Sequence, residues 1–296
     1  MSRTYLALLH YDGRAFAGWQ RQPEVRTVQG ELERVLERLC GSRIVANAAG
    51  RTDAGVHAAG MGVSLEMPDR WEPERLHRAL NGLLPVDCWV ERVRGMVPGF
   101  HARWSATARR YRYDVGTDAA SASPFRRGFE WALGKPLDEA RLAAAAQVLP
   151  GRHGFEGFSV RQAVVQPEIR RGDPLGRPNE SGLDRADSMG SKRPYQLGPT
   201  ECTITLAEWE SRPEQQGFRF HVAADRFLHH MVRFLVGTMV EIGLGRRAVE
   251  DMASLLRTTD NHDTSQPAPA EGLYFVAAAY PEECFLHSTE ALGDGR

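Results

Sequence analysis

The sequence contains few cysteines and no long apolar run. Its 296 residues include four cysteines, which lie far apart and form no CxxC pair: Cys40, Cys88, Cys202 and Cys284. This spacing favours reduced thiols. No apolar run approaches the roughly 18 residues of a membrane-spanning helix. The short apolar stretch near the N-terminus is interrupted by His10 and Asp12, which is not typical of a signal peptide. We therefore expect a cytoplasmic protein with no membrane partner.

Lysine is almost absent, and positive charge is not in excess. Lys135 and Lys192 are the two lysines among 37 basic residues, and 38 acidic residues bring the net charge to −1. This balance excludes a protein that is basic overall, so any surface for a nucleic acid has to be a local patch. Arginine suits such a patch, because its planar guanidinium donates two hydrogen bonds to one phosphate and stacks on bases.

Apolar periodicity and turn residues predict strands and helices in both halves of the chain. Thr27 is a plausible N-cap and Gly41 a plausible stop for the first helix. Strands are expected near 4–11, 43–48, 61–66, 88–94, the second half of 100–116, 201–209, 217–223 and 273–280. Helices are expected from Thr27, from Pro73, and over 137–149, 227–243 and 247–257. This pattern predicts an α+β protein with one continuous sheet.

Segment 171–200 has a different composition. It holds four prolines, five glycines and few large apolar residues. Such a stretch buries too little apolar surface to offset the entropy lost on ordering. We therefore expect an exposed, mobile insertion.

A glycine-flanked loop, AGRTDAGVHA at 49–58, directly follows a short predicted strand. Glycine allows positive φ angles and lets a ligand approach the backbone closely. Arg51 and Asp53 stand two residues apart, so both can project from one side of an extended loop. Taken alone, however, an aspartate in such a loop is more often a turn residue, with Arg51 a surface charge. His57 is interpreted as a structural histidine that bonds backbone.

Residues 100–113 combine cations with aromatics and contain no acid before Asp114. Arginines neutralise phosphates and aromatic faces stack on unpaired bases, so this mixture indicates RNA binding. The alternative is a basic edge strand with its aromatics in the core, and we expect that for Trp104 and Tyr113. The residues of this stretch are Phe100, His101, Arg103, Trp104, Arg109, Arg110, Tyr111, Arg112 and Tyr113.

The segment FLHHMVRFLVG at 227–237 predicts a buried helix that contains Arg233. A buried arginine requires a carboxylate partner, and Asp53 is the natural candidate. Such a pair would keep the carboxylate ionised. The adjacent His229 and His230 suggest a metal site, but neighbours on a helix diverge by about 100°. We therefore predict no metal.

Several motifs together resemble the tRNA pseudouridine synthase A family. GRTDAGVHA at 50–58 resembles the signature loop of that family, in which the aspartate is catalytic. YDGRAFAGWQRQ at 11–22, FHARWSATARRYRY at 100–113, FLHHMVRFLVG at 227–237 and AEGLYFVAAAYP at 270–281 resemble its other motifs. The matches follow the family order and extend from residue 5 to about 281.

The resemblance implies a fold and a set of site residues. The fold would be a large, mainly antiparallel sheet flanked by helices, with two similar halves around a central RNA-binding cleft. Residues 1–105 would form the half that carries the catalytic loop, and residues 106–296 the other half. Asp53 would be catalytic, and substrate-binding residues would be Tyr111, Arg233 and Arg51. RNA contacts would come from Gln20, Arg21, Arg103, Arg109 and Arg110.

The resemblance also implies the reaction. Uridines 38, 39 and 40 of tRNA would be isomerised to pseudouridine by a homodimer that binds RNA across both subunits. The reaction is redox-neutral and transfers no phosphate, so no cofactor is expected. Asp53 could attack C1′ or the base, or remove a ribose proton. A base in a stem has to leave its stack, and Arg51 would fill the vacated space while Tyr111 packs on the uracil.

Three features depart from the family pattern, and three alternatives stay open. The departures are the length of segment 171–200, Phe234 in place of a polar residue, and the loose match of GFEGFSVRQ at 154–162. The first alternative is a non-catalytic RNA-binding protein on the same fold, and the second is a related synthase that modifies other RNAs. The third, a glycosidase, requires two paired acids, and no convincing second acid is present.

Overall fold

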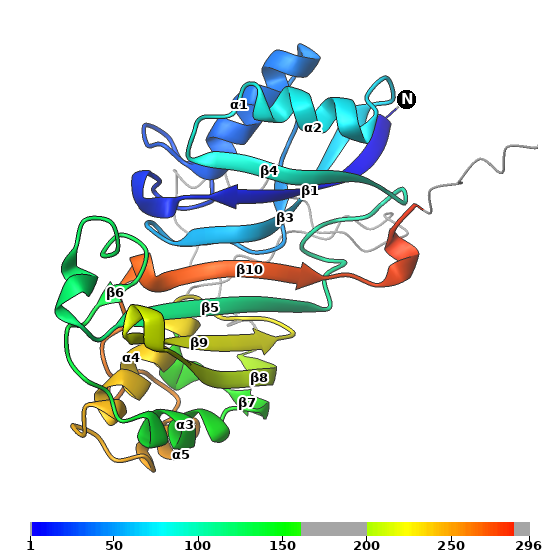
Figure 1. Cartoon of the computed structure of the whole chain (residues 1–296). Coiled ribbons are helices and arrows are strands. Elements are labelled where there is room, and N and C mark those ends of the chain that lie inside the picture. Colours follow the sequence, from blue (N-terminus) through cyan, green and yellow to red (C-terminus); the bar gives the residue numbers. More distant parts are fainter. Residues whose placement is uncertain (1, 161–199, 287–296) are drawn as a thin grey trace, which may run out of the picture.

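The computed structural model describes residues 2–160 and 200–286. Ten strands lie in these ranges: β1 (Ser2–Tyr11), β2 (Asn47–Ala48), β3 (His57–Pro68), β4 (Cys88–Met96), β5 (Ala108–Gly116), β6 (Trp131–Ala132), β7 (Gly151–Gly154), β8 (Glu201–Arg212), β9 (Gly217–Ala224) and β10 (Leu273–Ala279). They form one sheet in the order β4-β1-β3-β10-β5-β9-β8-β7, with β2 on β3 and β6 on β5 (Figure 1). The predicted continuous sheet is confirmed.

The sheet is mainly antiparallel, as predicted. Two pairs are parallel, β10 with β3 and β5 with β6. Although β10 follows the other strands along the chain, it lies between β3 and β5 (Figure 1). It pairs in parallel with β3, through Tyr274 opposite His57 and Phe275 opposite Ala58, and antiparallel with β5. One strand thus joins the N-terminal strands to the rest of the sheet.

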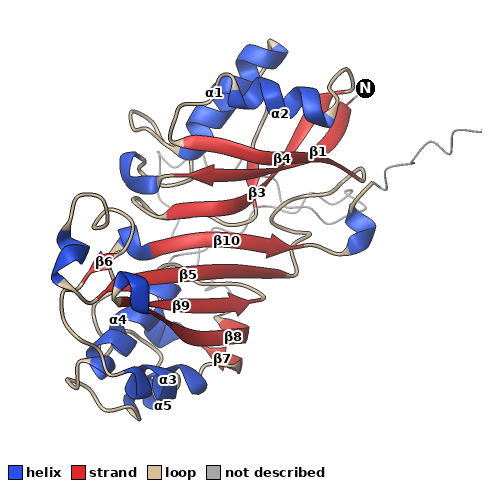
Figure 2. Ribbon diagram, viewed as in Figure 1, coloured by secondary structure: helices blue, strands red, loops and turns tan. Residues whose placement is uncertain are grey.

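The helices lie at the two ends of the sheet (Figure 2). α1 (Val28–Cys40) and α2 (Pro73–Asn81) lie at one end, and α3 (Glu139–Gln147), α4 (Met231–Gly243) and α5 (Asp251–Leu255) at the other. The predicted caps of α1 are confirmed: Thr27 Oγ1 accepts the N–H of Gly30 at 3.2 Å, and Gly41 is left-handed at φ 74°. Leu32 and Leu36 on its inner face are fully buried.

One helix boundary differs from the prediction in a way that changes the site. α4 begins at Met231 rather than at residue 227, and its N-cap His230 has a left-handed backbone with φ 61°. Before this segment, the carboxylate of Asp225 accepts the N–H of Thr203 at 2.9 Å. Residues 227–230 are therefore free of helical geometry and reach toward the loop that carries Asp53.

Apolar side chains from both ends of the sheet form one large core cluster. Across the described ranges, no helix is both long and apolar enough to cross a membrane. The segment expected to be an insertion, 171–200, lies outside the described residues except for residue 200. The division into halves at residue 105 stays a prediction. β10, which belongs to the second half, pairs with β3 of the first half and with β5 of the second.

Candidate active site

An open cleft of about 880 Å³ brings together stretches near residues 17–22, 49–56, 103–111 and 226–232. These stretches carry the motifs singled out in the sequence. Among the described residues that line the cleft, Asp53 is the single acid. The arginines that line it are Arg51, Arg103, Arg109 and Arg226. The cleft is therefore a cationic surface around one carboxylate, which suits a polyanionic ligand.

The N-terminal motif at 11–22 holds the loop that carries Asp53 in place. The N–H of Trp19 donates to the carbonyl of Thr52 at 3.0 Å, and the hydroxyls of Tyr11 and Thr52 lie 2.7 Å apart. Gly18 has φ 97°, and a Cβ on it would lie 2.7 Å from the Thr52 carbonyl oxygen. Only glycine fits this close approach without strain. Thr52 thus fixes the loop through its contacts with Tyr11 and Trp19.

Three cationic or polar side chains surround the Asp53 carboxylate. His229 Nε2 lies 3.3 Å from Oδ1, His230 Nε2 lies 3.3 Å from Oδ2, and Arg233 Nη1 lies 3.7 Å from Oδ2. Burial alone would raise the pKa of Asp53, but hydrogen bonding from His229 and the charges of both histidines and Arg233 outweigh it. The pKa is lowered overall. The carboxyl group is therefore ionised at neutral pH.

The predicted partner of Arg233 is confirmed as a contact. The Arg233 side chain is 16% exposed and reaches Asp53 from the first turn of α4. Its Nε donates to the carbonyl of Ala268 at 2.7 Å. One partly buried guanidinium thus links the Asp53 loop to the segment that precedes β10.

The reason given for excluding a shared site at the two histidines is wrong. His229 and His230 precede α4 rather than lie on it, and the left-handed backbone of His230 turns both imidazoles toward Asp53. Their ring centroids lie 4.0 Å apart. One ligand atom from each of Asp53, His229 and His230 lies within 4.8 Å of the other two. Nothing in the sequence marks a left-handed histidine, so sequence reasoning missed both contacts.

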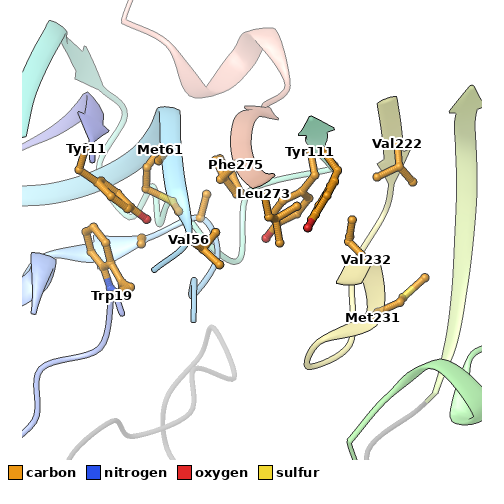
Figure 3. Packing of buried hydrophobic residues seen from close by; sticks show 14 of the residues in the cluster. Tyr11, Trp19, Val56, Met61, Tyr111, Val222, Met231, Val232, Leu273 and Phe275 are labelled. Carbon is orange, nitrogen blue, oxygen red and sulfur yellow. The ribbon is translucent and has the colours of Figure 1, made fainter. Parts of the chain in front are cut away.

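Tyr111 lies in the wall of the cleft, on β5. Its ring packs edge-on against Phe227 and Phe275, with centroids 4.9 and 5.1 Å away. Figure 3 shows Tyr111 beside Leu273 and Phe275 of β10, with Val56 from the side of the Asp53 loop. Burial raises the pKa of its hydroxyl, so the phenol stays protonated at neutral pH. Tyr111 is thus a rigid aromatic surface at the side of the carboxylate.

The predicted RNA contacts divide into two groups. Gln20, Arg103 and Arg109 line the cleft, as does Arg51, which was predicted to bind substrate, whereas Arg21 and Arg110 do not. Arg21 is exposed and pairs with the buried Glu33 at 3.1 Å. Arg110 is the neighbour of Tyr111 on β5, so its side chain points to the opposite face of the sheet. The structure does not bring these two arginines to the carboxylate.

Arg109 is engaged with backbone. Its guanidinium donates to the carbonyls of Ala49 at 3.3 Å, Ala106 at 3.0 Å and Asp225 at 2.8 Å, and also to that of Arg103. Burial lowers its pKa. These contacts join the stretches that form the cleft, which leaves little of the guanidinium free for phosphate.

The expectation that Trp104 lies in the core is wrong. Trp104 is 53% exposed and lines the cleft, because β5 begins only at Ala108 and residues 102–105 form a turn before it. The guanidinium of Arg103 lies 4.6 Å from the centre of its indole. Tyr113, in contrast, is fully buried as predicted, and its hydroxyl donates to the carbonyl of Pro269 at 2.7 Å.

His57 has the structural role that was predicted. Its Nδ1 accepts the N–H of Gly13 at 3.1 Å, and its Nε2 lies 3.1 Å from the carbonyl oxygen of Gly128. The ring stacks on Tyr274 with centroids 4.7 Å apart. Burial lowers its pKa. His57 therefore fixes the end of the loop that carries Asp53 and does not line the cleft.

Comparison with known proteins identifies the family. A family model described as tRNA pseudouridine synthase matches residues 7–98 and 186–281. The tRNA pseudouridine synthase A of Thermus thermophilus is 39% identical over 282 residues, which cover 95% of this chain and 98% of that protein. The protein of the same name from Geobacillus kaustophilus is 35% identical over 289 residues, covering 97% of this chain and 98% of that protein. This chain therefore belongs to the tRNA pseudouridine synthase family of isomerases, of the synthase A type.

Proposed function

We propose that this protein isomerises uridines 38, 39 and 40 in the anticodon stem-loop of tRNA, with Asp53 as the catalytic carboxylate. One observation carries the proposal: among the described residues that line the positively charged cleft, one ionised acid stands among the cations. A glycosidase would require a second acid across the cleft, and the described lining residues offer none.

The chemistry needs one such carboxylate and no redox partner. The N1–C1′ bond of uridine breaks, the base turns, and a C5–C1′ bond forms. The hydrogen on C5 leaves as a proton and N1 gains one, so atoms and electrons balance. Attack on C1′, attack on the base and removal of a ribose proton all start from an ionised Asp53. The cation of Arg233 at 3.7 Å supports that charge state.

The target base has to leave the stem to reach Asp53. Tyr111 lies in the wall of the same cleft, held edge-on by Phe227 and Phe275, and would pack on the extruded uracil. Arg51 is exposed two residues before Asp53, where its long side chain would occupy the gap left in the stem. Gln20, Arg103 and the exposed Trp104 would contact the surrounding RNA.

The remaining RNA contacts require surface outside the cleft. A volume of about 880 Å³ suits a nucleotide or two rather than a stem-loop. We include in the proposal a cytoplasmic homodimer that binds one tRNA across both subunits, and a division of each chain into halves 1–105 and 106–296. The resemblance to the family supports these points. Light scattering with and without tRNA would measure the number of subunits.

Mapping of pseudouridine tests the proposed function directly. Unmodified tRNA transcripts are incubated with the wild-type protein, with Asp53→Asn and with Asp138→Asn, and pseudouridine is mapped by position. Asp138 is an exposed N-cap of α3, and asparagine caps a helix equally well, so this variant is a matched control. Asp53→Asn should form no pseudouridine and still bind tRNA, because an amide is neither a nucleophile nor a base.

Each other outcome of the mapping has a definite meaning. Turnover by Asp53→Asn would disprove the catalytic role. Binding without turnover by the wild type would indicate a non-catalytic RNA-binding protein. Pseudouridine at other positions, or in other RNAs only, would indicate a related synthase.

A further inference from the structure

The two histidines in contact with Asp53 have no role in the function proposed above. We propose that His229 and His230 are positioning residues, each of which directs its Nε2–H at one oxygen of the Asp53 carboxylate. This inference rests on the proposed function, because it assumes that the orientation of Asp53 limits catalysis. The contacts are equal in length, 3.3 Å from His229 to Oδ1 and 3.3 Å from His230 to Oδ2.

The backbone is bent to bring these imidazoles together. His230 is one of few non-glycine residues with positive φ in the described chain, at 61°. Such backbone is uncommon for residues with a side chain, and it persists where the surrounding structure enforces it. Here the carbonyl of His229 accepts the N–H of Val160 at 3.3 Å, and that of His230 accepts the N–H of Phe234 at 3.1 Å. A regular helix would instead send the two side chains in different directions.

The surroundings of His229 select one tautomer. Its Nδ1 is buried and has no hydrogen-bond partner among the described residues. A hydrogen on Nδ1 would be a buried donor without an acceptor, which is costly. In that tautomer Nε2 would also carry no hydrogen, and its lone pair would face the carboxylate oxygen. Both arguments place the hydrogen on Nε2, where it faces Oδ1 of Asp53.

The same observations argue against a metal ion between the three side chains, although the spacing of their ligand atoms would admit one. Coordination through Nε2 would move the His229 hydrogen to the buried, unpartnered Nδ1. Histidines that bind metals normally donate that hydrogen to a second group. The guanidinium of Arg233, 3.7 Å from Asp53 Oδ2, would also repel a divalent cation.

Two hydrogen-bond donors can orient a carboxylate and still leave it free to react. Each carboxylate oxygen has two lone pairs, so each keeps one for the reaction after it accepts from a histidine. Oδ1 is oriented by His229 and Oδ2 by His230, and the Arg233 cation lies farther from Oδ2, at 3.7 Å. The plane of the carboxylate is thereby set before the uridine arrives, and no rotation has to be restricted during the reaction.

Paired variants test this role in the full-length protein. His229→Leu removes the donor, whereas the amide of His229→Gln reaches about as far as Nε2 and can replace its hydrogen. His230→Gly removes the other imidazole and keeps the left-handed backbone. We expect kcat to fall about 10- to 100-fold in His229→Leu and His230→Gly, with KM within about threefold of wild type. His229→Gln should recover to within about fivefold.

Controls separate this role from folding and from the proposed function. His262→Leu changes an exposed histidine outside the cleft and should leave kcat unchanged. Wild-type kcat in His229→Leu, a change in KM alone, or no recovery in His229→Gln would overturn the proposal. If wild type and Asp53→Asn are equally inactive on tRNA, the proposed function fails instead.

A measurement on the wild-type protein does not depend on turnover. Nitrogen-15 NMR of labelled histidines at pH 8 distinguishes the two neutral tautomers. We expect the Nε2–H form for both His229 and His230. The Nδ1–H form at His229 would overturn the proposal. So would loss of activity on dialysis against EDTA that added Zn²⁺ or Mn²⁺ restores, since that result would indicate a metal centre.

Discussion

Arg233 and Ala268 exchange two hydrogen bonds. The Nε–H of Arg233 donates to the carbonyl of Ala268 at 2.7 Å, and the N–H of Ala268 donates to the carbonyl of Arg233 at 2.9 Å. The segment that contains Gln266 and Ala268 lies directly against α4. A Cβ on Gly237 of that helix would come within 2.1 Å of the Gln266 carbonyl oxygen. These bonds fix the guanidinium on its inner side and leave Nη1 directed at Asp53.

Replacing Arg233 by lysine should separate charge from geometry. Lysine keeps the positive charge but lacks the planar fork that donates to Ala268 and reaches Asp53 at once. We expect kcat/KM of Arg233→Lys to fall about 10- to 100-fold, which corresponds to about 1.4–3 kcal/mol. The kcat/KM of Arg233→Met should fall further, because methionine lacks both the charge and the donors. Steady-state kinetics on a tRNA transcript give the comparison, and equal activity of both variants with wild type would contradict it.

The lowered pKa of Asp53 predicts a pH dependence of stability. A carboxyl with a lowered pKa in the folded state adds stability above its unfolded pKa, about 3.9, and loses it as the pH falls through the folded pKa. The difference in unfolding free energy between wild type and Asp53→Asn should therefore rise with pH below about pH 4 and be flat above it. Urea titrations between acidic and neutral pH measure this. A difference that decreases with rising pH would mean that burial dominates.

Arg109 should behave as a structural residue. A lysine at this position cannot serve the four carbonyls that its guanidinium contacts. We expect Arg109→Lys to lower the unfolding free energy by about 1–3 kcal/mol and to leave the salt dependence of tRNA binding unchanged. Arg51→Gln, at an exposed position, is the matched control and should reduce the salt slope by about one. The opposite pattern would make Arg109 a phosphate contact.

Trp104 should contribute to RNA affinity rather than to stability. Stacking of an unpaired base on an aromatic ring is worth about 1–3 kcal/mol, and the indole is 53% exposed on the cleft. Trp104→Ala should weaken binding of an anticodon stem-loop RNA about 5- to 100-fold, and Trp104→Phe much less. Fluorescence anisotropy measures the affinity, with thermal unfolding alongside. A lower melting temperature with unchanged affinity would place Trp104 in a structural role.

Local chemistry made part of this architecture predictable. Thr27 and Gly41 bound α1 because capping depends on hydrogen bonds within a few residues. The partner of Arg233 followed from a general cost, since a guanidinium among apolar residues needs a carboxylate, and Asp53 is that carboxylate. The caps required no knowledge of distant parts of the chain, whereas the ion pair was predicted across two distant segments from the cost of leaving a guanidinium without a partner.

Other features depend on contacts between distant segments and were not predictable. The apolar pattern suggests a helix from residue 227, but Asp225 binds the N–H of Thr203 and the helix begins at Met231. That shift frees His229 and His230 to face Asp53. Arg109 looked like a phosphate contact, because a sequence does not show which carbonyls converge on an arginine.

The position of β10 has a consequence for how the protein is made. The ribosome synthesises every other strand of the described sheet before β10, yet this strand fills the gap between β3 and β5. Until it inserts, a nascent chain exposes two unpaired strand edges, which are templates for aggregation. The stretch before β10 also supplies the Ala268 carbonyl that holds Arg233. The contact between Arg233 and Asp53 is therefore completed late in biosynthesis, in the same step that closes the sheet.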